Sequence, residues 1–594
     1  MKSYIFSEWV SLLFSLGLMV SLLVGCQKPT ANSGPGDSVN LVDATPPASG
    51  KLRSGEKIPT IPTREESGRQ AWFEEIETTG IHFEFSSGRS DGEFAIIESL
   101  GGGVGVIDFD KDGRPDLLFA GGGTLANKTV SSSPCGLFRN LGDWRFEEVT
   151  QAAGASAGQC FTHGIFPADL DNDGFDDVAI SGYGGVQILH NQGDGTFLAM
   201  PLLVTHPEFP WSSSLAWADF DRDGALDLYV AHYVNWSWDH HPSCAGAGAP
   251  REVCAPRDFA AIRDAIFFAD GAGGFRREDQ SIGLVDAGKG LGVVASDVDL
   301  DGDVDIYVAN DTTDNFLYLN DGTGRFQESA LLAGVAGDER GVSTGSMGTL
   351  VFDADHDGRP DLWTVNFERE LFGLYRNDGG GLFTHVSRAM GLASIGGDFV
   401  GFGTVAIDYD QDGDLDLVVS NGHVSYASPN APFKQLPLLL ENNRGRFSRV
   451  HPSQDYFANS HSGRGLASAD FDGDGVLDLV VSHLEEPVSI LRGHCSVSNP
   501  AIKLHLIGTV SNRNAIGAVV RLSEKRILMH NGGGSYLSSS DPAVWLTALT
   551  PGAQQQFQVV WPSGKEDEYV VSSDAGEFTI VEPMSPQSRL PDSP

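Results

Sequence analysis

Basic residues are scarce in this sequence. Its 594 residues include 39 Lys and Arg against 80 Asp and Glu, which gives a formal net charge of −41. This imbalance argues against nucleic-acid binding and against electrostatic docking on anionic lipid, because both need a surface excess of Lys and Arg. Charged residues are only 20% of the chain and aromatic residues 9%, as in an ordinary folded protein, so the acidity is not that of a disordered tail. Bound cations are the expected counter-charge.

Long hydrophobic runs are equally scarce, and the single one lies near the N-terminus. Lys2 precedes an apolar run over Val10–Val24, which leads into Gly25 and Cys26. A short apolar segment that ends in Leu-Val-Gly-Cys resembles a bacterial lipoprotein signal, which implies a signal peptide over residues 1–25 and a lipid on Cys26. The alternative is an uncleaved anchor helix near the lower length limit for spanning a bilayer. The lipoprotein interpretation predicts an extracytoplasmic protein, lipid-anchored in the bacterial cell envelope at the outer membrane or cell surface, that meets the membrane only through this anchor.

The segment after this signal is poor in the residues that build a core. Residues 26–66 combine several prolines with Gly, Ser and Thr. Such a composition cannot bury enough apolar surface to offset the entropy lost on folding. We therefore expect residues 26–66 to be a disordered tether.

Cysteine is rare as well, with six residues in the chain. Export from the cytoplasm permits disulfides, so the cysteines after the lipidation site need partners. One plausible pairing joins Cys135 to Cys160 and Cys244 to Cys254, and it leaves Cys495 over.

Several catalytic motifs are absent: the sequence has no His-Glu-x-x-His, no Gly-Lys-Ser/Thr and no Cys-x-x-Cys. Gly341-Val342-Ser343-Thr344-Gly345 does match the serine-hydrolase pattern Gly-x-Ser-x-Gly. That pattern needs a strand-to-helix turn in an α/β sheet with Asp and His following, whereas this copy lies in a Gly-rich loop that leads to a strand. We therefore predict no catalytic residue from the sequence.

One acidic motif is abundant. Asp-x-Asp-x-Asp-Gly-x-x-Asp occurs seven times at start-to-start intervals of 50 to 78 residues, whereas the composition predicts about 0.02 chance matches. We number the copies loop 1 to loop 7 along the chain. Their aspartates are Asp108, Asp110, Asp112 and Asp116; Asp169, Asp171, Asp173 and Asp177; Asp219, Asp221, Asp223 and Asp227; Asp297, Asp299, Asp301 and Asp305; Asp353, Asp355, Asp357 and Asp361; Asp408, Asp410, Asp412 and Asp416; and Asp470, Asp472, Asp474 and Asp478.

The spacing of these aspartates indicates calcium. Three carboxylates on alternate residues converge when the chain wraps tightly, Gly at position six permits the turn, and Asp at position nine closes the shell. Mg²⁺ fits less well, because it keeps several waters. Position seven varies from Arg114 to Val476, as expected where only a main-chain carbonyl binds the ion. We predict about seven Ca²⁺ ions; the alternative is a set of Asp-rich solvated turns.

The segments around the loops predict strands rather than the helices of an EF-hand. Each loop is followed by a short apolar run, such as Leu117-Leu118-Phe119, which predicts a buried strand. Next comes an apolar run that ends in Asn, then Asp or Gly, then Phe, which predicts a β-hairpin. Residues 267–275 form a looser copy without the Asn, and the copy after loop 7 is missing.

The N-terminal part of the domain supplies the missing strand. Phe73-Glu74-Glu75-Ile76 echoes Phe146-Glu147-Glu148-Val149, so it can complete the last unit. A ring of four-stranded sheets closed in this way leaves no long exposed edge. We therefore predict an all-β fold, with a seven-bladed β-propeller carrying calcium-binding loops over residues 67–495 and a small C-terminal β-rich domain.

These motifs resemble known families. The loops and hairpins resemble FG-GAP/VCBS repeats, the calcium-loop blades of integrin-α-like propellers. Residues 500–583 resemble an ASPIC/UnbV domain through Ser511–Ala518, Gly532–Ser538 and Trp561–Gly564, followed by a tail at 584–594. With Cys244, Cys254 and the Ala-Pro after them, the chain beyond the tether resembles the cartilage-acidic-protein family in a bacterial lipoprotein form. The resemblance implies calcium in the loops and leaves the task of the ASPIC/UnbV domain undefined.

Two further features invite a functional interpretation. The long interval between loops 3 and 4 holds an insertion with His232, Tyr233, Trp236, Trp238, His240 and His241. Its aromatic residues can form a platform for a sugar or a partner side chain and its histidines can bind zinc, but packing onto the ring is the more ordinary role. Arg464, ahead of loop 7, either binds an anion near the channel or pairs with local carboxylates.

These observations favour a binding protein. We expect a calcium-stabilised, lipid-anchored adhesion protein of the cell envelope that recognises an extracellular protein or glycan and is not an enzyme. The alternative is a lyase or hydrolase that acts on extracellular polysaccharide, because propellers host such sites at their central channel; a third possibility is a purely structural envelope component. A paired Glu/Asp or a Tyr/His/Arg cluster at the channel mouth would favour the enzyme.

Overall fold

The computed structural model describes residues 71–584 apart from 206–210, 247–248, 250, 272–273, 279–281, 287, 396, 452–455, 497–498, 551 and 575. The predicted signal peptide (1–25), the tether (26–66) and Cys26 lie outside the described residues, as does the tail from residue 585. The described residues belong to one compact unit, Glu66–Pro594. No helix among them is long and apolar enough to cross a membrane.

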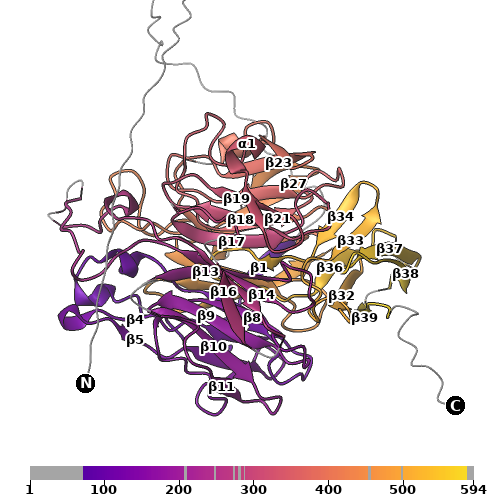
Figure 1. The fold of residues 1–594 in the computed structure, drawn as a ribbon, viewed down its shortest axis with the longest axis horizontal. Helices are drawn as coiled ribbons and strands as arrows, with labels where there is room; N and C mark the ends of the chain where they lie inside the picture. Colours follow the sequence, from indigo (N-terminus) through magenta and orange to yellow (C-terminus); the bar gives the residue numbers. More distant parts are fainter. Residues whose placement is uncertain are drawn as a thin grey trace, which may run out of the picture. The chain divides into compact units, whose positions relative to one another are not determined.

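Seven antiparallel sheets, each built on four strands consecutive in space, occupy residues 71–495 of the described chain (Figure 1). We number them by the Asp loop that each contains. Sheets 1 to 3 are β2 (Val104–Ile107), β3 (Asp116–Phe119), β6 (Gly136–Asn140) and β7 (Phe146–Glu148); β8 (Phe161–Ala168), β9 (Asp177–Tyr183), β10 (Gly185–Asn191) and β11 (Phe197–Ala199); and β13 (Ser212–Ala218), β14 (Asp227–His232), β15 (Ala265–Ala269) and β16 (Phe275–Glu278). Sheets 4 and 5 are β17 (Gly290–Ser296), β18 (Asp305–Asn310), β19 (Phe316–Asn320) and β20 (Phe326–Glu328); and β21 (Thr349–Phe352), β22 (Asp361–Thr364), β23 (Gly373–Gly379) and β24 (Leu382–His385). Sheets 6 and 7 are β25 (Gly401–Ile407), β26 (Asp416–Asn421), β27 (Leu438–Asn443) and β28 (Arg446–Val450); and β29 (Gly463–Ala469), β30 (Asp478–His483), β31 (Ser489–Cys495) and β1 (Ala71–Glu75).

The sheets form a closed propeller. The first strand of each sheet contacts the first strand of the next, and β29 of sheet 7 contacts β2 of sheet 1. Strand β1 is the outer strand of sheet 7, where it pairs antiparallel with β31 and places Phe73 opposite Gly493. The closing strand predicted from the sequence is therefore present. The looser hairpin at residues 267–275 also forms. Strands β15 and β16 pair antiparallel there, with Ala269 opposite Phe275.

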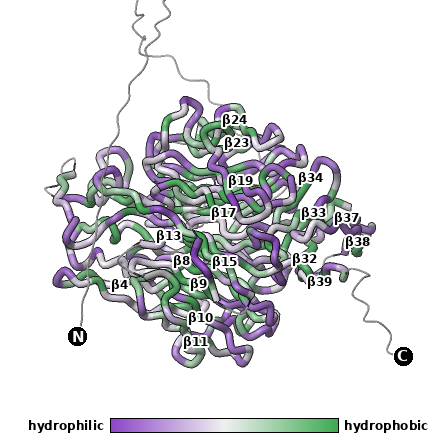
Figure 2. Tube along the Cα trace, viewed as in Figure 1, coloured by the Kyte–Doolittle hydropathy of each residue, from purple (hydrophilic) through white to green (hydrophobic). Residues whose placement is uncertain are grey.

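The core lies between the sheets. The innermost strands are almost entirely buried along their length, as in β13, β17 and β29. Hydrophobic positions follow the strands and hydrophilic positions follow the outer turns (Figure 2). This distribution is expected where both faces of every sheet pack against neighbouring sheets. The α-helix α1 (Ala330–Ala333), which follows β20, is the one α-helix among the described residues.

The C-terminal domain is a separate pair of small sheets. One sheet has the order β36-β32-β39 and the other β34-β33-β37-β38. Their bounds are β32 (Ala501–Ile507), β33 (Val519–Ser523), β34 (Arg526–Met529), β36 (Val544–Thr547), β37 (Gln554–Val560), β38 (Glu566–Ser572) and β39 (Gly576–Val581). Alternate residues of β32, such as Ile502 and Leu504, are fully buried in the core of this domain.

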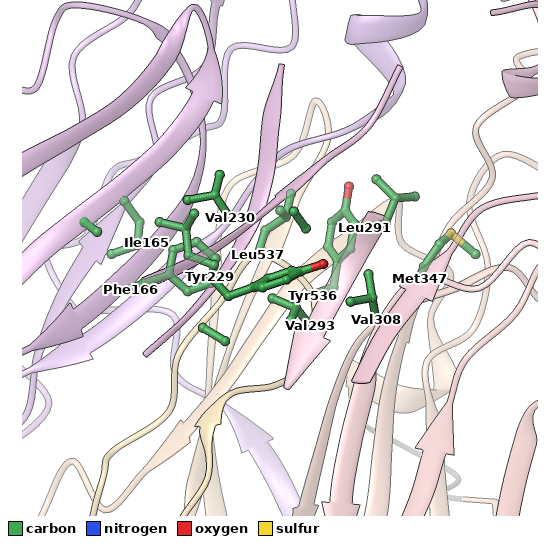
Figure 3. Close-up of a cluster of buried hydrophobic side chains, with 14 of the residues drawn as sticks. Ile165, Phe166, Tyr229, Val230, Leu291, Val293, Val308, Met347, Tyr536 and Leu537 are labelled. Atoms are coloured by element: carbon green, nitrogen blue, oxygen red, sulfur yellow. The ribbon is translucent and has the colours of Figure 1, made fainter. Parts of the chain in front are cut away.

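A segment of the C-terminal domain fills the propeller channel. We call residues 532–540, which begin with β35 (Gly532–Gly533), the plug. It contacts the innermost strand of all seven sheets, through Val106 N to Ser539 O (2.9 Å), Ile165 N to Leu537 O (3.1 Å), Gly532 against Trp217 O, Gly534 N to Val293 O (2.8 Å), Ser535 N to Thr349 O (2.8 Å), Thr404 N to Ser535 Oγ (3.1 Å) and Ser535 Oγ to Leu466 O (3.0 Å). Tyr536 and Leu537 lie among buried side chains that include Ile165 and Val293 of the inner strands and Met347, which precedes β21 (Figure 3).

Small residues make the plug possible. A Cβ atom added at Gly532 would lie 1.7 Å from Trp217 O, so only glycine permits this approach. Residues Gly532–Ser538 carry part of a family resemblance, but their sequence does not predict that they enter the propeller. Their run of Gly and Ser residues does indicate that another part of the backbone approaches closely, but it does not identify that part.

Candidate metal centres and channel openings

Each Asp loop connects the first strand of a sheet to the second, and its ninth residue begins the second strand. In loop 1, Asp108 accepts hydrogen bonds from Asp112 N (3.0 Å) and Gly113 N (3.1 Å). Asp116 Oδ2 accepts one from Phe109 N (3.3 Å). The same bonds recur in the other loops, as from Asp412 N and Gly413 N to Asp408. The backbone therefore turns the aspartates toward a common centre.

Two positions in each loop adopt left-handed backbone conformations. The glycine at position six has a positive φ in all seven loops, as the sequence predicts. Position four does too, although six of the seven residues there are not glycine: Lys111, Asn172, Arg222, Leu300, His356 and Gln411. This conformation costs about 1 kcal/mol or more for such residues, so the rest of each loop must hold it. The sequence does not predict this conformation, because the residue types at position four have nothing in common.

The carboxylates of a loop lie close enough to share a cation. Ligand oxygens lie within 4.8 Å of one another in the groups Asp108, Asp110 and Asp116; Asp169, Asp171 and Asp173; Asp219, Asp221 and Asp227; and Asp297, Asp299 and Asp305. Buried oxygens of the third-position residues Asp221 and Asp355 have no hydrogen-bond donor among the described residues. An all-oxygen donor set with orphaned carboxylate oxygens fits a hard cation.

Burial makes these carboxylates unfavourable as bare anions. Burial, together with the neighbouring loop carboxylates, raises the pKa of Asp116 to about 8, that of Asp227 to about 8 and that of Asp361 to about 8. The first-position residues respond in the same direction, and burial raises the pKa of Asp353 to about 7. A bound divalent cation would supply the missing positive charge and hold the groups ionised.

Asparagines tie neighbouring sheets together beside the loops. Asn377 Nδ2 donates to Val298 O in loop 4 (2.7 Å) and to Pro360 O in its own loop 5 (2.9 Å). The equivalent cross-sheet bonds are made by Asn140, Asn191, Asn320 and Asn442. Sheets 3 and 7 have Ala269 and Gly493 in place of the asparagine. There the main-chain N–H still donates to the aspartate at position nine of the loop, but no side chain can make the cross-sheet bond. The Asn of the hairpin pattern therefore joins sheets as well as forming a turn.

The C-terminal domain contacts three of the loops directly. Arg513 Nε lies 3.4 Å from Asp169 Oδ2, and Ile527 N donates to Asp353 Oδ2 (3.1 Å). Thr547 Oγ1 donates to Asp408 Oδ2. This domain therefore covers the loop face of the propeller and touches candidate metal ligands of loops 2, 5 and 6.

The opposite face of the propeller is closed by its own loops. The insertion contains the disulfide Cys244–Cys254, which agrees with the sequence prediction. Trp236 and Tyr233 are 0% and 1% exposed, so they pack the insertion down and form no open platform. The insertion reaches the loop after β26, where Glu252 accepts hydrogen bonds from Ser425 Oγ (2.7 Å) and Ala427 N (3.0 Å).

The predicted pair Cys135–Cys160 is wrong. Both residues are buried free thiols, and Cys135 donates to Thr162 Oγ1 at 3.9 Å. Burial raises the pKa of Cys135 to about 11 and that of Cys160 to about 12. Disulfide formation proceeds through a thiolate, so burial disfavours the reactive form as well as access to it. Cys495 is in no disulfide among the described residues, and its thiol donates to Asp410 O at 3.4 Å.

Arg464 lies under this closed opening. It is fully buried and donates to Ser99 O (3.0 and 3.1 Å), Gly463 O (2.8 Å) and His423 O (3.2 Å), with its guanidinium 3.9 Å from the Phe402 ring centroid. Burial lowers the pKa of Arg464 to about 10. The guanidinium donors of Arg464 bind main-chain carbonyl oxygens. Arg464 therefore neither binds an anion nor pairs with a carboxylate, the two roles that the sequence suggested.

Acidic groups with raised pKa values lie near this opening. Glu98 is 1% exposed and accepts a hydrogen bond from Tyr426 OH (2.9 Å), and burial raises its pKa to about 7. Burial also raises the pKa of Glu370 to about 7. Ser343 of the Gly-x-Ser-x-Gly pattern lies in a loop and donates a hydrogen bond to Asp314. It therefore lacks the histidine partner and the strand-to-helix turn that a hydrolase nucleophile needs.

Sequence comparisons relate the chain to two families and to characterised relatives. It matches the FG-GAP-like repeat over residues 108–180, 169–230 and 297–364, and the ASPIC and UnbV family over residues 508–585. Cartilage acidic protein 1 of Mus musculus is 27% identical over 404 residues, covering 63% of this chain and 55% of the mouse protein. The Xenopus tropicalis protein is 24% identical over 502 residues, covering 78% of this chain and 70% of that protein. The chain thus spans just over half of the mouse relative.

Solved structures resemble the chain at low similarity. A lectin of Agrocybe aegerita that recognises non-reducing terminal N-acetylglucosamine has a TM-score of 0.37 and 16% identity, covering 65% of this chain and 93% of the lectin. The rhamnogalacturonan lyase YesX has a TM-score of 0.37 and 12% identity, covering 66% and 72%. At these scores the likeness carries no argument about function. The family matches and the relatives together show that this chain carries FG-GAP-like repeats and an ASPIC/UnbV domain, the architecture of cartilage acidic protein 1.

Proposed function

We propose that this protein is a calcium-stabilised binding protein of an extracytoplasmic compartment, anchored through a lipid on Cys26, that recognises an extracellular protein or glycan. The observation that carries the calcium part is the clustering of the loop carboxylates, together with the orphaned carboxylate oxygens of Asp221 and Asp355. Ca²⁺ takes six to eight oxygen ligands and suits such loops. The aspartates at positions one, three, five and nine would hold the ion, which would supply charge compensation and cross-link each loop.

The recognition part is supported by the repeats and by the burial of polar groups. FG-GAP-like repeats and an ASPIC/UnbV domain are shared with cartilage acidic protein 1. Arg464, Glu98 and His423 are at most 1% exposed, so they cannot contact a substrate in this conformation. Burial of this kind disfavours catalysis by these groups at the opening closed by the insertion.

Three experiments test this proposal. Elemental analysis of the full chain should find calcium in stoichiometric amount, about seven ions per chain; a chain without alkaline-earth metal would refute the calcium part. Arrays of glycans and secreted proteins, probed with and without calcium, should give calcium-dependent ligands. Lipid labelling should be lost in a Cys26→Ser variant, and retained labelling would refute the anchor.

A polysaccharide-acting lyase or hydrolase is the second candidate. The observation in its favour is the Glu98–Tyr426 hydrogen bond beside Arg464, since a carboxyl group with a raised pKa and a Tyr are usual in acid–base catalysis. A product assay on the polysaccharides of the same array distinguishes the two candidates: cleavage products that are lost in Glu98→Gln and Tyr426→Phe would support the enzyme and overturn the non-enzymatic assignment.

A further inference from the structure

A cavity of about 400 Å³ lies between the loop face of the propeller and the C-terminal domain. Strand β32 forms part of its wall. Its alternate residues Ala501, Lys503 and His505 line the cavity, while Ile502 and Leu504 fill the domain core. The propeller side of the wall comes from the ends of the inner strands and from residues of loops 1, 2, 5, 6 and 7. The volume falls in the range of small-molecule sites, about 300 to 1,000 Å³.

The charged side chains of β32 in this wall are paired with neighbouring carboxylates, and the candidate metal ligands Asp108, Asp353 and Asp408 also line the cavity. Lys503 Nζ lies 2.9 Å from Asp541 Oδ2 and 5.5 Å from the ring centroid of Trp545. Trp545 and Glu577 flank Lys503 on the neighbouring strands β36 and β39, and Glu577 Oε1 lies 2.5 Å from His505 Nε2. Because Lys503 already has a carboxylate partner, the wall offers no free positive charge to an anionic ligand.

Three neutral polar groups of the cavity wall have no partner among the described residues: His530 Nε2, Asn531 Oδ1 and Trp545 Nε1. His530 is 7% exposed, and burial lowers its pKa to about 4, so its ring is neutral near pH 7. Asn531 Nδ2 donates to Val351 O (2.8 Å), which leaves its carbonyl oxygen unused. Buried polar groups without partners are costly, and ordered water or a ligand normally satisfies them.

The three groups fit one class of ligand. The indole of Trp545 can only donate, Asn531 Oδ1 can only accept, and the Nε2 of a neutral His530 accepts when its other nitrogen carries the proton. Hydroxyl groups satisfy both kinds, since each donates once and accepts twice. An aromatic side chain beside such groups also suits the apolar face of a sugar ring.

We propose that this interdomain cavity binds a neutral sugar, with Trp545 donating to a sugar oxygen and with His530 and Asn531 accepting from sugar hydroxyls. This inference deepens the proposed recognition of a glycan and rests on it. It places the recognition site on the C-terminal domain rather than on the aromatic insertion of the propeller, and it gives the ASPIC/UnbV domain a task.

Saturation-transfer NMR on the full chain with calcium present tests the site, with glucose, galactose and mannose as probes. Trp545→Phe keeps the aromatic ring and removes only the indole donor. Trp72→Phe, at a residue 42% exposed on β1, is the matched control. One lost hydrogen bond should weaken binding of the best probe about fivefold in Trp545→Phe and leave it unchanged in Trp72→Phe.

A second variant fills the space. Ala501→Phe places a large side chain in the cavity, and it should abolish saturation transfer while circular dichroism shows the folded protein. Signals that persist at full strength in both Trp545→Phe and Ala501→Phe would overturn the site while leaving glycan recognition elsewhere intact. No transfer from any probe to the wild type, with a glycan or protein still captured on the arrays, would overturn the site and leave the binding function standing.

Discussion

The two openings of the propeller channel are closed in different ways. On the face without Asp loops, the propeller closes the opening with its own chain: the disulfide-linked insertion meets the loop after β26 at Glu252, and Arg464 lies beneath it. On the loop face, the plug (532–540) of the C-terminal domain occupies the channel, and a cavity of about 400 Å³ lies beside it.

The difference lies in how polar groups are satisfied. Under the insertion, the guanidinium of Arg464 finds three carbonyl oxygens and Glu252 accepts hydrogen bonds from the loop that it meets. Beside the plug, His530 Nε2 and Asn531 Oδ1 have no partner among the described residues. The hydrogen-bonded charges under the insertion stabilise a closed structure, although Trp238 Nε1 of the insertion also has no partner among the described residues. Beside the plug, the unsatisfied groups belong to residues that line a cavity, which marks a place for a ligand.

The largest expected effect is removal of divalent cations, which should act first on the loop face. A site kept at ten times its dissociation constant contributes about 1.4 kcal/mol, so seven sites together rival the 5 to 15 kcal/mol by which domains are stable. EDTA should therefore lower the melting temperature strongly in calorimetry, while EDTA presaturated with calcium should not. Hydrogen exchange should rise first in the Asp loops and in the plug. An unchanged calorimetric trace would contradict the role of metal.

The next effect concerns the plug. Gly532→Val puts side-chain atoms where a Cβ would already lie 1.7 Å from Trp217 O, so the plug must shift. We expect a loss of about 3 kcal/mol or more in the free energy of unfolding, as for overpacked cores. Gly158→Ala is the control, because a Cβ there meets nothing within 4 Å. Equal midpoints of denaturation for the two variants would show that the plug does not hold the channel.

The third effect is a pH dependence of the free energy of unfolding that arises at the opening covered by the insertion. Burial raises the pKa of Glu98 from 4.5 to about 7, so the native state binds a proton more tightly than the unfolded state does. The resulting stability is fully present below pH 4.5 and is lost as the pH rises through 7, on the order of 3 kcal/mol in total. Urea unfolding at pH 4.5 and 8 measures it. Glu98→Gln should remove this part of the dependence, and identical pH profiles for variant and wild type would contradict the assignment.

The smallest effect tests the ties between sheets on the loop face. Asn377→Ala removes the bonds to Val298 O and Pro360 O and the acceptor for Gly379 N, which should cost about 2 kcal/mol. Ala269→Asn offers the reciprocal variant, because sheet 3 lacks the tie, and it should gain up to about 1 kcal/mol. Denaturant midpoints measure both changes. If Asn377→Ala is neutral, these asparagines serve the hairpin turns only.

Much of the propeller is predictable from local pattern. The Asp loops, the strands that follow them and the hairpins each carry their signal within about ten residues, so repetition revealed them. The closing strand was also predictable, since Phe73–Ile76 repeats a hairpin strand that the last unit lacks. The disulfide Cys244–Cys254 spans a separation of only 10 residues.

Other features depend on which surfaces meet. The cysteine positions in the sequence suggested both the pair Cys244–Cys254 and the pair Cys135–Cys160. The second pair is wrong, because Cys135 and Cys160 are buried as separate thiols. Arg464 carries a charge that suggests a carboxylate or an anion, yet folding surrounds it with carbonyl oxygens from Ser99 and His423. Neither environment is encoded near the residue itself.

The sequence by itself determined the repeated unit, its acidic loops and the closure of the ring, because helical and strand periodicity, turn chemistry and carboxylate spacing are local properties of the chain. Only the tertiary structure decided that residues 532–540 fill the channel, that the insertion closes the other opening, and that a polar cavity lies between the two domains. These results follow from long-range packing, in which segments hundreds of residues apart exclude water together, and no local pattern specifies such a partner.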